Sequence, residues 1–176
     1  MRIHIIPIGY VDSSALECLR GLLSKRFNAE VRLESNIPVE LFRMNVLRKQ
    51  YLSTGMLRAL SGMRSIHGGV LLGVADVDLY VPSLNFVFGE ADPSDRVAVI
   101  SVTRLRQSFY GLRDDTALFL DRVGKEAVHE LGHVFNLRHC TQPRCVKFFS
   151  NSLADTDWKE DDFCNRCRTD LYTNDF

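Results

Sequence analysis

The sequence lacks the features that would place it among membrane proteins or nucleic-acid-binding proteins. Its 176 residues contain no uninterrupted apolar run near the roughly 18 to 20 residues that a membrane span needs. It has no charge excess, with 22 basic against 22 acidic side chains, and so lacks the basic footprint of a duplex binder. It also has no internal repeat. The length indicates one compact unit with a small appendage, and we expect a monomer with neither a nucleic-acid nor a membrane partner.

The N-terminus lacks the layout of a secretory signal. A short apolar run ends at Pro7 without a small-residue cleavage site, and we expect neither a secretory signal nor an inhibitory pro-segment. We therefore expect a cytoplasmic protein whose thiols stay reduced. Clustered cysteines are then more often metal ligands than disulfides.

Apolar periodicity predicts an α/β fold. Short apolar or alternating runs predict strands over residues 2–8, 30–34, 70–80, 86–88 and 97–102. Apolar residues at helical spacing predict helices over residues 14–27, 50–63 and 116–135. The links between the last three strands are short and rich in turn residues, which favours antiparallel pairing there. The sheet is therefore predicted to be mixed.

Two histidines on the last predicted helix indicate a metal site. His129 and His133 lie one helical turn apart, so both imidazoles project from one face and can bind one zinc ion. Glu130 lies beside them and can take a proton from a zinc-bound water. His139 reaches the same ion only if the helix stops first, and Asn136 tolerates the left-handed conformation that ends helices. The alternative is an exposed histidine pair with an unrelated histidine after it.

Four cysteines follow directly, in the pattern C-x4-C-x18-C-x2-C: Cys140, Cys145, Cys164 and Cys167. This is similar to the spacing of a structural tetrathiolate zinc site, in which four thiolates leave no open position for water. The tail beyond Cys140 has too few aliphatic residues for a core of its own, so such an ion would stabilise it. Two disulfides or free buried thiols remain alternatives.

The remaining histidines and the fifth cysteine are predicted to have structural roles. Cys18 lies among leucines on the first helix and is predicted to fill the core. His4 alternates with apolar residues on the first strand and is interpreted as a packed histidine. His67 is interpreted as a turn residue, because no partner lies at ligand spacing.

The direct junction of His139 with Cys140, following His129, Glu130 and His133, resembles the motif of the archaemetzincin family of zinc metallopeptidases, a branch of the metzincins. Segments 76–82, 86–89 and 145–152 are also similar to family segments. The resemblance implies an α/β/α sandwich with a mixed twisted sheet, a long active-site helix at about residues 117–136 and a small zinc-stapled C-terminal subdomain. It divides the chain into a catalytic core, residues 1–139, and a four-cysteine subdomain, residues 140–176.

The resemblance also implies an activity. A catalytic zinc ion would be held by His129, His133 and His139, and a second, structural zinc ion by the four cysteines. The chain would then be a zinc-dependent metallopeptidase that hydrolyses a peptide or protein substrate with a zinc-bound water activated by Glu130. An extended peptide would pair along a cleft-facing edge at residues 85–89.

Two positions depart from the family pattern. Asn136 replaces a glycine, and Lys147 replaces the methionine from which the metzincins take their name. The alternative function is therefore a catalytically weak or inactive zinc protein of the same fold that acts as a peptide-binding or regulatory module. A zinc-ribbon nucleic-acid binder is not favoured, because the cysteine segment lacks interleaved basic and aromatic residues. The candidates for the oxyanion-stabilising group are Tyr80, Tyr110, Tyr172 and Lys147.

Overall fold

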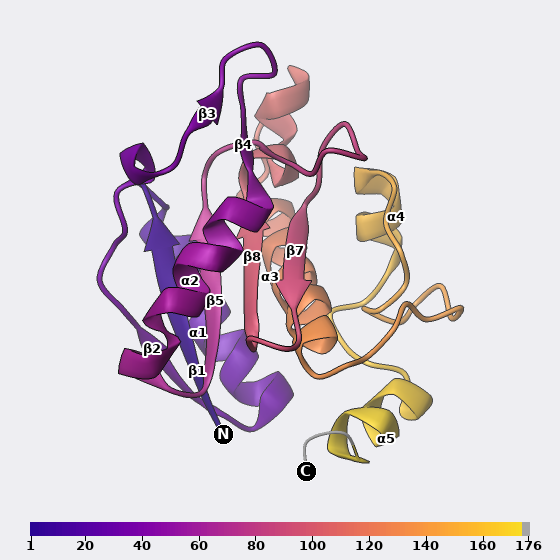
Figure 1. The fold of residues 1–176 in the computed structure, drawn as a ribbon. Coiled ribbons are helices and arrows are strands. Elements are labelled where there is room, and N and C mark those ends of the chain that lie inside the picture. The colour runs from indigo at the N-terminus through magenta and orange to yellow at the C-terminus, as the bar shows by residue number, and fades with distance from the viewer. Residues whose placement is uncertain (174–176) are drawn as a thin grey trace.

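The computed structural model describes residues 1–173 and shows a mixed α/β fold (Figure 1). The strands are β1 (Arg2–Ile8), β2 (Glu30–Leu33), β3 (Met44–Asn45), β4 (Gln50–Leu52), β5 (Val70–Ala75), β6 (Leu79–Tyr80), β7 (Gly89–Asp92) and β8 (Val97–Ser101). The α-helices are α1 (Ser13–Phe27), α2 (Ser53–His67), α3 (Thr116–Val134), α4 (Leu153–Trp158) and α5 (Asn165–Thr173). No helix among these residues is long and apolar enough to cross a membrane.

The main sheet is mixed, as predicted. Its strand order is β2-β1-β5-β8-β7, with β7 antiparallel to β8 and every other pair parallel. The expectation of antiparallel pairing throughout residues 70–102 is wrong for β5 and β8, which are parallel neighbours. β8 lies between β5 and β7, and only its pairing with β7 is antiparallel. The strand expected at residues 86–88 begins only at Gly89, and β7 is left as an edge of the sheet.

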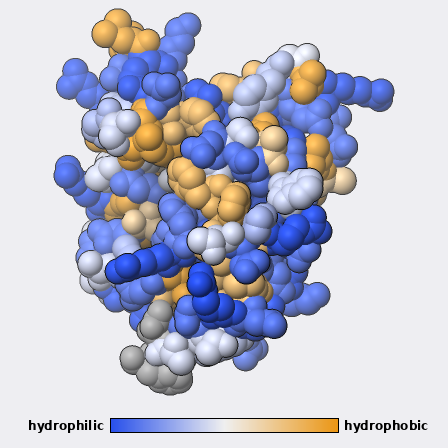
Figure 2. All heavy atoms as spheres, turned by 90° about the vertical axis from the view of Figure 1, so that its right-hand side faces the viewer, coloured by the Kyte–Doolittle hydropathy of each residue, from blue (hydrophilic) through white to orange (hydrophobic). Residues whose placement is uncertain are grey.

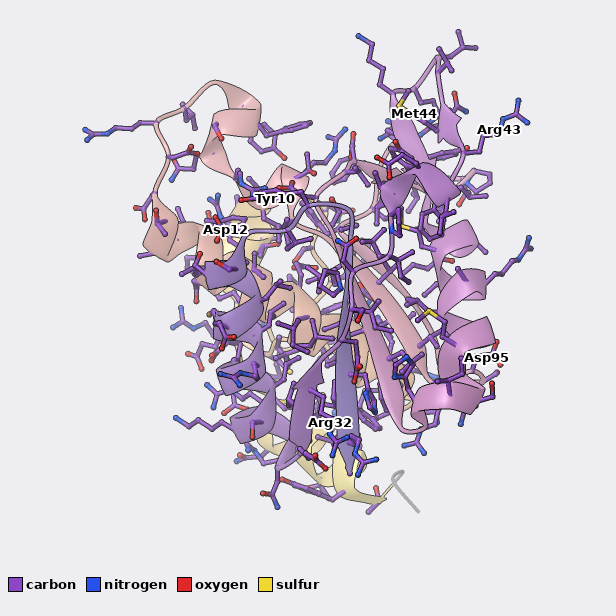
Figure 3. The ribbon with its side chains drawn as sticks, turned by 90° about the vertical axis from the view of Figure 1, so that its left-hand side faces the viewer. Tyr10, Asp12, Arg32, Arg43, Met44 and Asp95 are labelled. Atoms are coloured by element: carbon purple, nitrogen blue, oxygen red, sulfur yellow. The ribbon has the colours of Figure 1, made fainter. Side chains whose placement is uncertain are left out.

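Helices cover both faces of the main sheet. Figure 3 shows α1 on one side of the strands and α2 on the other, and α3 shares the face of α1. Every residue of β5 is buried, as expected for a central strand covered on both faces. Gly73 allows α2 to approach, because a Cβ there would lie 2.9 Å from Leu60 Cδ1.

Helix α3, which carries His129 and His133, has identifiable local signals at both ends. Asp115 caps its N-terminus, where the side chain accepts a hydrogen bond from the Leu118 backbone N–H. At the other end Val134 is the last helical residue, one residue before the end expected from periodicity and two before the end that the resemblance implies. Asn136 then adopts the left-handed conformation with φ 62°, which confirms the role predicted for it. The chain turns here, and His139 is carried back toward the helix.

The tail after His139 packs against the face of the sheet that carries α3. Val146, Phe163 and Leu171 belong to the same buried cluster as the apolar residues of α1 and α3. Arg122 of α3 forms a two-pronged ion pair with Asp157 of α4, with N–O distances of 2.6 and 2.7 Å. Residues 174–176 of the predicted subdomain lie outside the described residues.

Candidate metal centres and active site

The three predicted histidines converge on one point. His129 and His133 project from α3, and His139 follows the turn, so that one nitrogen from each ring lies within 4.8 Å of the other two. The Nε2 atoms of His133 and His139 are 3.2 Å apart. Tetrahedral zinc with Zn–N bonds of 2.0–2.1 Å places its ligand nitrogens about 3.3 Å apart. The spacing of the rings therefore fits zinc.

A backbone contact fixes the orientation of the His129 ring. Its Nδ1 lies 2.8 Å from the Val146 carbonyl oxygen, and an N–H at this position donates to that oxygen. The Nε2 lone pair is then left for a metal ion, an arrangement common among metal-binding histidines. The cysteine-containing tail, which carries Val146, thus orients a ligand on α3.

The environment keeps all three rings neutral, as metal ligation requires. Burial lowers the pKa of His129 well below 6.5, and the nearby charge of Lys147 lowers it further. Burial likewise lowers the pKa of His133 to about 3 and lowers that of the more exposed His139. Neutral imidazoles offer lone pairs without first releasing protons.

Glu130 lies buried beside the histidines, next to the start of β7. Burial raises the pKa of its carboxyl group, and the positive charge of Lys147 opposes this rise. A Cβ on Gly89 would lie 2.5 Å from Glu130 Cγ and 2.8 Å from the Val99 carbonyl oxygen. The absence of a side chain at Gly89 therefore makes room for Glu130.

A pocket of about 250 Å³ opens over His129 and Glu130. Segment 84–89 forms one wall, and Phe149, Ser150 and Asn151 contribute to the other side. A neighbouring hollow of about 710 Å³ shares Phe86 and Asn151 with it. Both adjoin the segment leading into α4, on the side of the molecule shown in Figure 2, where apolar side chains gather among hydrophilic ones.

The predicted oxyanion candidates lie elsewhere. Tyr80, Tyr110 and Tyr172 do not line this pocket, and Lys147 donates to a backbone oxygen. The hydroxyl of Ser150 is the polar group that sequence reasoning missed. It lines the pocket, and its Oγ is buried without a hydrogen-bond partner among the described residues.

Lys147 is fully buried beneath α3, so its charge is not screened by solvent. Its Nζ donates to the His129 carbonyl oxygen at 2.7 Å. Gly132 makes room for it, because a Cβ there would lie 2.6 Å from Lys147 Cδ. Burial lowers the pKa of the ammonium group, while the Glu130 carboxylate raises it. Lys147, at the position where the resemblance implies a methionine, thus contacts the backbone of α3 at His129.

A buried ion pair lies beside the site and was not predicted. Lys159 Nζ is 3.0 Å from Glu126 Oε1 and 3.5 Å from His129 Nδ1. Thr156 also donates to Glu126, at 3.2 Å. The helical offset of four residues between Glu126 and Glu130 was the available signal, because it places both carboxylates on the same face. The position of Lys159 had no local signal.

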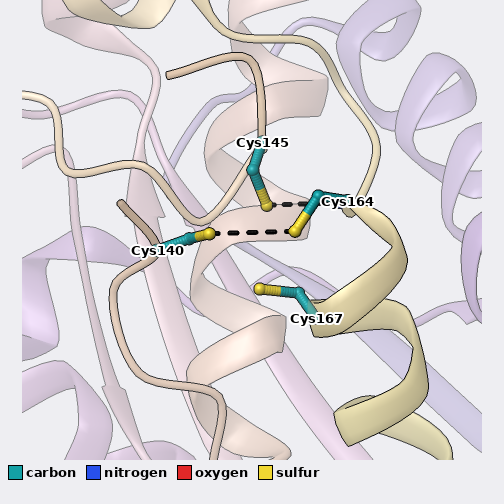
Figure 4. Close-up of side chains that lie close together, drawn as sticks. All are labelled: Cys140, Cys145, Cys164 and Cys167. Atoms are coloured by element: carbon teal, nitrogen blue, oxygen red, sulfur yellow. Dashed lines mark hydrogen bonds between the residues drawn. The ribbon is translucent and has the colours of Figure 1, made fainter. Parts of the chain in front are cut away.

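The four cysteines of the tail also converge. Figure 4 shows Cys140 and Cys145 on loops facing Cys164 and Cys167, which lie at the start of α5. The sulfurs of Cys140 and Cys164 are 3.8 Å apart, and tetrahedral zinc with Zn–S bonds of 2.3 Å separates its sulfurs by about 3.8 Å. All four are free thiols rather than disulfides. Cys18 is half-buried on α1 and lies outside this cluster.

Three neutral imidazoles around one point, with the carboxyl group of Glu130 beside them, are the side chains typical of a zinc metallopeptidase. The fold and the site place the chain in that class. The chain belongs to peptidase family M54, whose sequence model matches residues 27–173.

Curated relatives and solved structures agree with this assignment. The archaemetzincin of Pyrococcus abyssi is 43% identical over 98% of this chain and 95% of its own length. The crystal structure of archaemetzincin from Archaeoglobus fulgidus complexed with malonate has a TM-score of 0.84 at 43% identity, covering 97% of this chain and 99% of that one. A zinc-dependent peptidase from Methanocorpusculum labreanum has a TM-score of 0.86 at 30% identity, covering 96% and 99%.

Proposed function

We propose that this chain hydrolyses peptide bonds at the pocket over His129 and Glu130, with a catalytic zinc ion held by His129, His133 and His139. The observation that carries the proposal is the convergence of three neutral imidazoles beside a buried carboxylate. Zinc bound there would acidify water and polarise the scissile carbonyl group. The similarity to a structure described as a zinc-dependent peptidase supports the same activity.

Glu130 is the residue that moves protons in this proposal. Because burial raises the pKa of its carboxyl group, it accepts a proton more readily than an exposed glutamate. It takes this proton from the attacking water and passes it to the leaving amine. Gly89 leaves the carboxylate free to occupy its position, and the Val146 carbonyl keeps His129 in the orientation that the reaction needs.

The substrate is a peptide or protein segment bound in extended form along residues 85–89. This segment lines the pocket and leads into β7, an edge strand with a free side for pairing. Phe86, Phe88 and Phe149 give the pocket an apolar lining suited to an apolar substrate side chain. Ser150 also lines this pocket, and its buried hydroxyl group has no hydrogen-bond partner among residues 1–173.

The four cysteines hold a second, structural zinc ion in this proposal, which makes residues 140–176 a zinc-stabilised subdomain attached to a catalytic core of residues 1–139. The sulfur spacing supports it. Free thiols fit a reducing compartment, and we place the protein in the cytoplasm. We also propose a monomer without a nucleic-acid or membrane partner, and the balanced charge supports the absence of a nucleic-acid partner.

One observation favours the second candidate, a peptide-binding or regulatory module of low activity. Lys147 places a cationic group in a fully buried position, 2.7 Å from the backbone oxygen of a zinc ligand. A positive charge there opposes the binding of a dication. Glu130 and Glu126 supply compensating negative charge in the same interior, and for that reason the peptidase is the preferred function.

A peptide library separates the two functions. The zinc-loaded wild type should cleave members of the library, and Glu130→Gln should lower the rate at least about 10²-fold by removing the general base. Glu160→Gln, in an exposed ion pair with Arg144, is the matched control and should retain the wild-type rate. Equal cleavage by wild type and Glu130→Gln would contradict the role of Glu130. Binding of library peptides without cleavage by any form would support the module instead.

A further inference from the structure

A second group of histidines lies outside the catalytic site. His4 of β1, Glu34 just after β2 and His67 at the end of α2 come together, with one ligand atom of each within 4.8 Å of the others. His4 Nδ1 is 2.6 Å from Glu34 Oε1, and His67 Nδ1 is 3.7 Å from Glu34 Oε2. The centres of the two rings are 5.2 Å apart. His4 is packed, as predicted, whereas His67 ends α2 instead of lying in a turn. The sequence did not indicate that both lie near Glu34.

The sheet separates this group from the active site. Ile3 and Ile5 of β1 belong to the apolar cluster of α3, while Ile6 and Ile8 belong to the cluster of α2 on the opposite face. Side chains alternate along a strand, so His4 shares the face of Ile6. The group therefore has no ligand in common with the catalytic histidines. In Figure 3 the label of Arg32 marks this end of the fold, because Arg32 of β2 is the residue paired with His4 in the sheet.

Glycines bring His67 against β1. Gly68 and Gly69 follow it with φ values of 66° and 65°, in the left-handed region that favours glycine. A Cβ on Gly69 would lie 2.5 Å from the Arg2 carbonyl oxygen. This close approach sets the end of α2 against the start of β1. The three donors are thus held by backbone packing as well as by their own contacts.

The hydrogen bonds within the group leave one donor nitrogen unused. His4 is only 2% exposed, and its Nε2 is buried without a partner among the residues that the structure describes. The hydrogen bond from His4 lowers the pKa of Glu34, so the carboxylate is ionised at neutral pH. The idle Nε2 of His4 is not the nitrogen that faces Glu34 and takes no part in this group. What the group offers a cation is an ionised carboxylate between the Nδ1 atoms of two imidazoles.

We propose that His4, Glu34 and His67 form a third metal site, which binds Zn²⁺ independently of the catalytic histidines and the four cysteines. Two imidazole nitrogens and one carboxylate oxygen are a zinc-type ligand set, and a water would complete it. Zinc bound to Nδ1 of His4 and to Glu34 would separate these atoms to about 3.4 Å. The ion would tie the edge of the sheet to the end of α2.

Zinc counting by native mass spectrometry at micromolar free zinc tests the proposal. His67 is the residue to change, because its partial exposure makes His67→Ala tolerable to the fold. Ser65→Ala, on the exposed surface of the same helical turn, is the matched control. Wild type and Ser65→Ala should each hold one zinc ion more than His67→Ala. This difference does not depend on how many zinc ions the catalytic histidines and the four cysteines bind. Glu34→Gln should weaken this extra zinc at least about 10-fold.

Equal zinc counts in wild type and His67→Ala would overturn the proposal and leave an ordinary ion pair between His4 and Glu34. Because the comparison is a difference between two variants with intact catalytic residues, failure of the peptidase proposal would not change its outcome. Circular dichroism of His67→Ala should show the wild-type spectrum, so that a lost zinc ion reports the lost ligand.

Discussion

A methyl group on Gly89 is a direct test of how the fold positions Glu130. The Cβ of Gly89→Ala would lie 2.5 Å from Glu130 Cγ and 2.9 Å from its Cδ, where carbon atoms normally approach to about 3.5–4.0 Å. The glutamate side chain must therefore move by about 1 Å. Misplacement of a catalytic group by this distance costs about 10²-fold in rate, which corresponds to about 2.7 kcal/mol in the activation barrier.

The same methyl group also meets the backbone. It would lie 2.8 Å from the Val99 carbonyl oxygen, so β7 must shift against β8, and we expect a loss of about 1–3 kcal/mol in the free energy of unfolding. None of the three atoms nearest to this methyl group belongs to a histidine, and the zinc content should stay at the wild-type value.

Kinetics and metal analysis together check this reasoning. kcat for a peptide cleaved by the wild type should fall in Gly89→Ala while circular dichroism and zinc content remain unchanged. Gly55→Ala is the control, because a Cβ there meets nothing within 4 Å. A folded Gly89→Ala protein with the wild-type kcat would refute the claim that the start of β7 positions Glu130.

Three further changes test other parts of the structure. Asn136→Gly should raise the free energy of unfolding by up to about 1 kcal/mol, measured by denaturant titration, since φ is 62° there; a loss of stability would contradict the left-handed turn. Asp157→Asn should cost about 2 kcal/mol because it strands the buried Arg122, whereas Glu160→Gln at an exposed pair should cost less than about 1 kcal/mol; equal costs would contradict the burial argument. Cys164→Ser should release one zinc ion and make the tail sensitive to limited proteolysis, and retention of that ion would argue against the tetrathiolate site.

The convergence of the candidate metal-binding histidines could be predicted because their geometry is local. The offset between His129 and His133 places them on one helix face in any fold that keeps the helix, and the left-handed Asn136 follows from the need to return His139. Helix boundaries were less accurate: α2 runs to His67, beyond the end expected at Met63, because the two glycines that stop it follow His67.

The sequence was sufficient to predict the class of fold, the three converging histidines, the carboxyl group beside them and the four converging cysteines, since each rests on periodicity or on spacing within a short segment. The burial of Lys147, the ion pair of Glu126 with Lys159 and the meeting of His4, Glu34 and His67 become visible only in the folded chain. These contacts join residues about 20 to 60 positions apart, and they exist only because of the order of the strands and the faces that the helices cover. No local pattern encodes such neighbours, because their approach is set by the packing of the whole sheet.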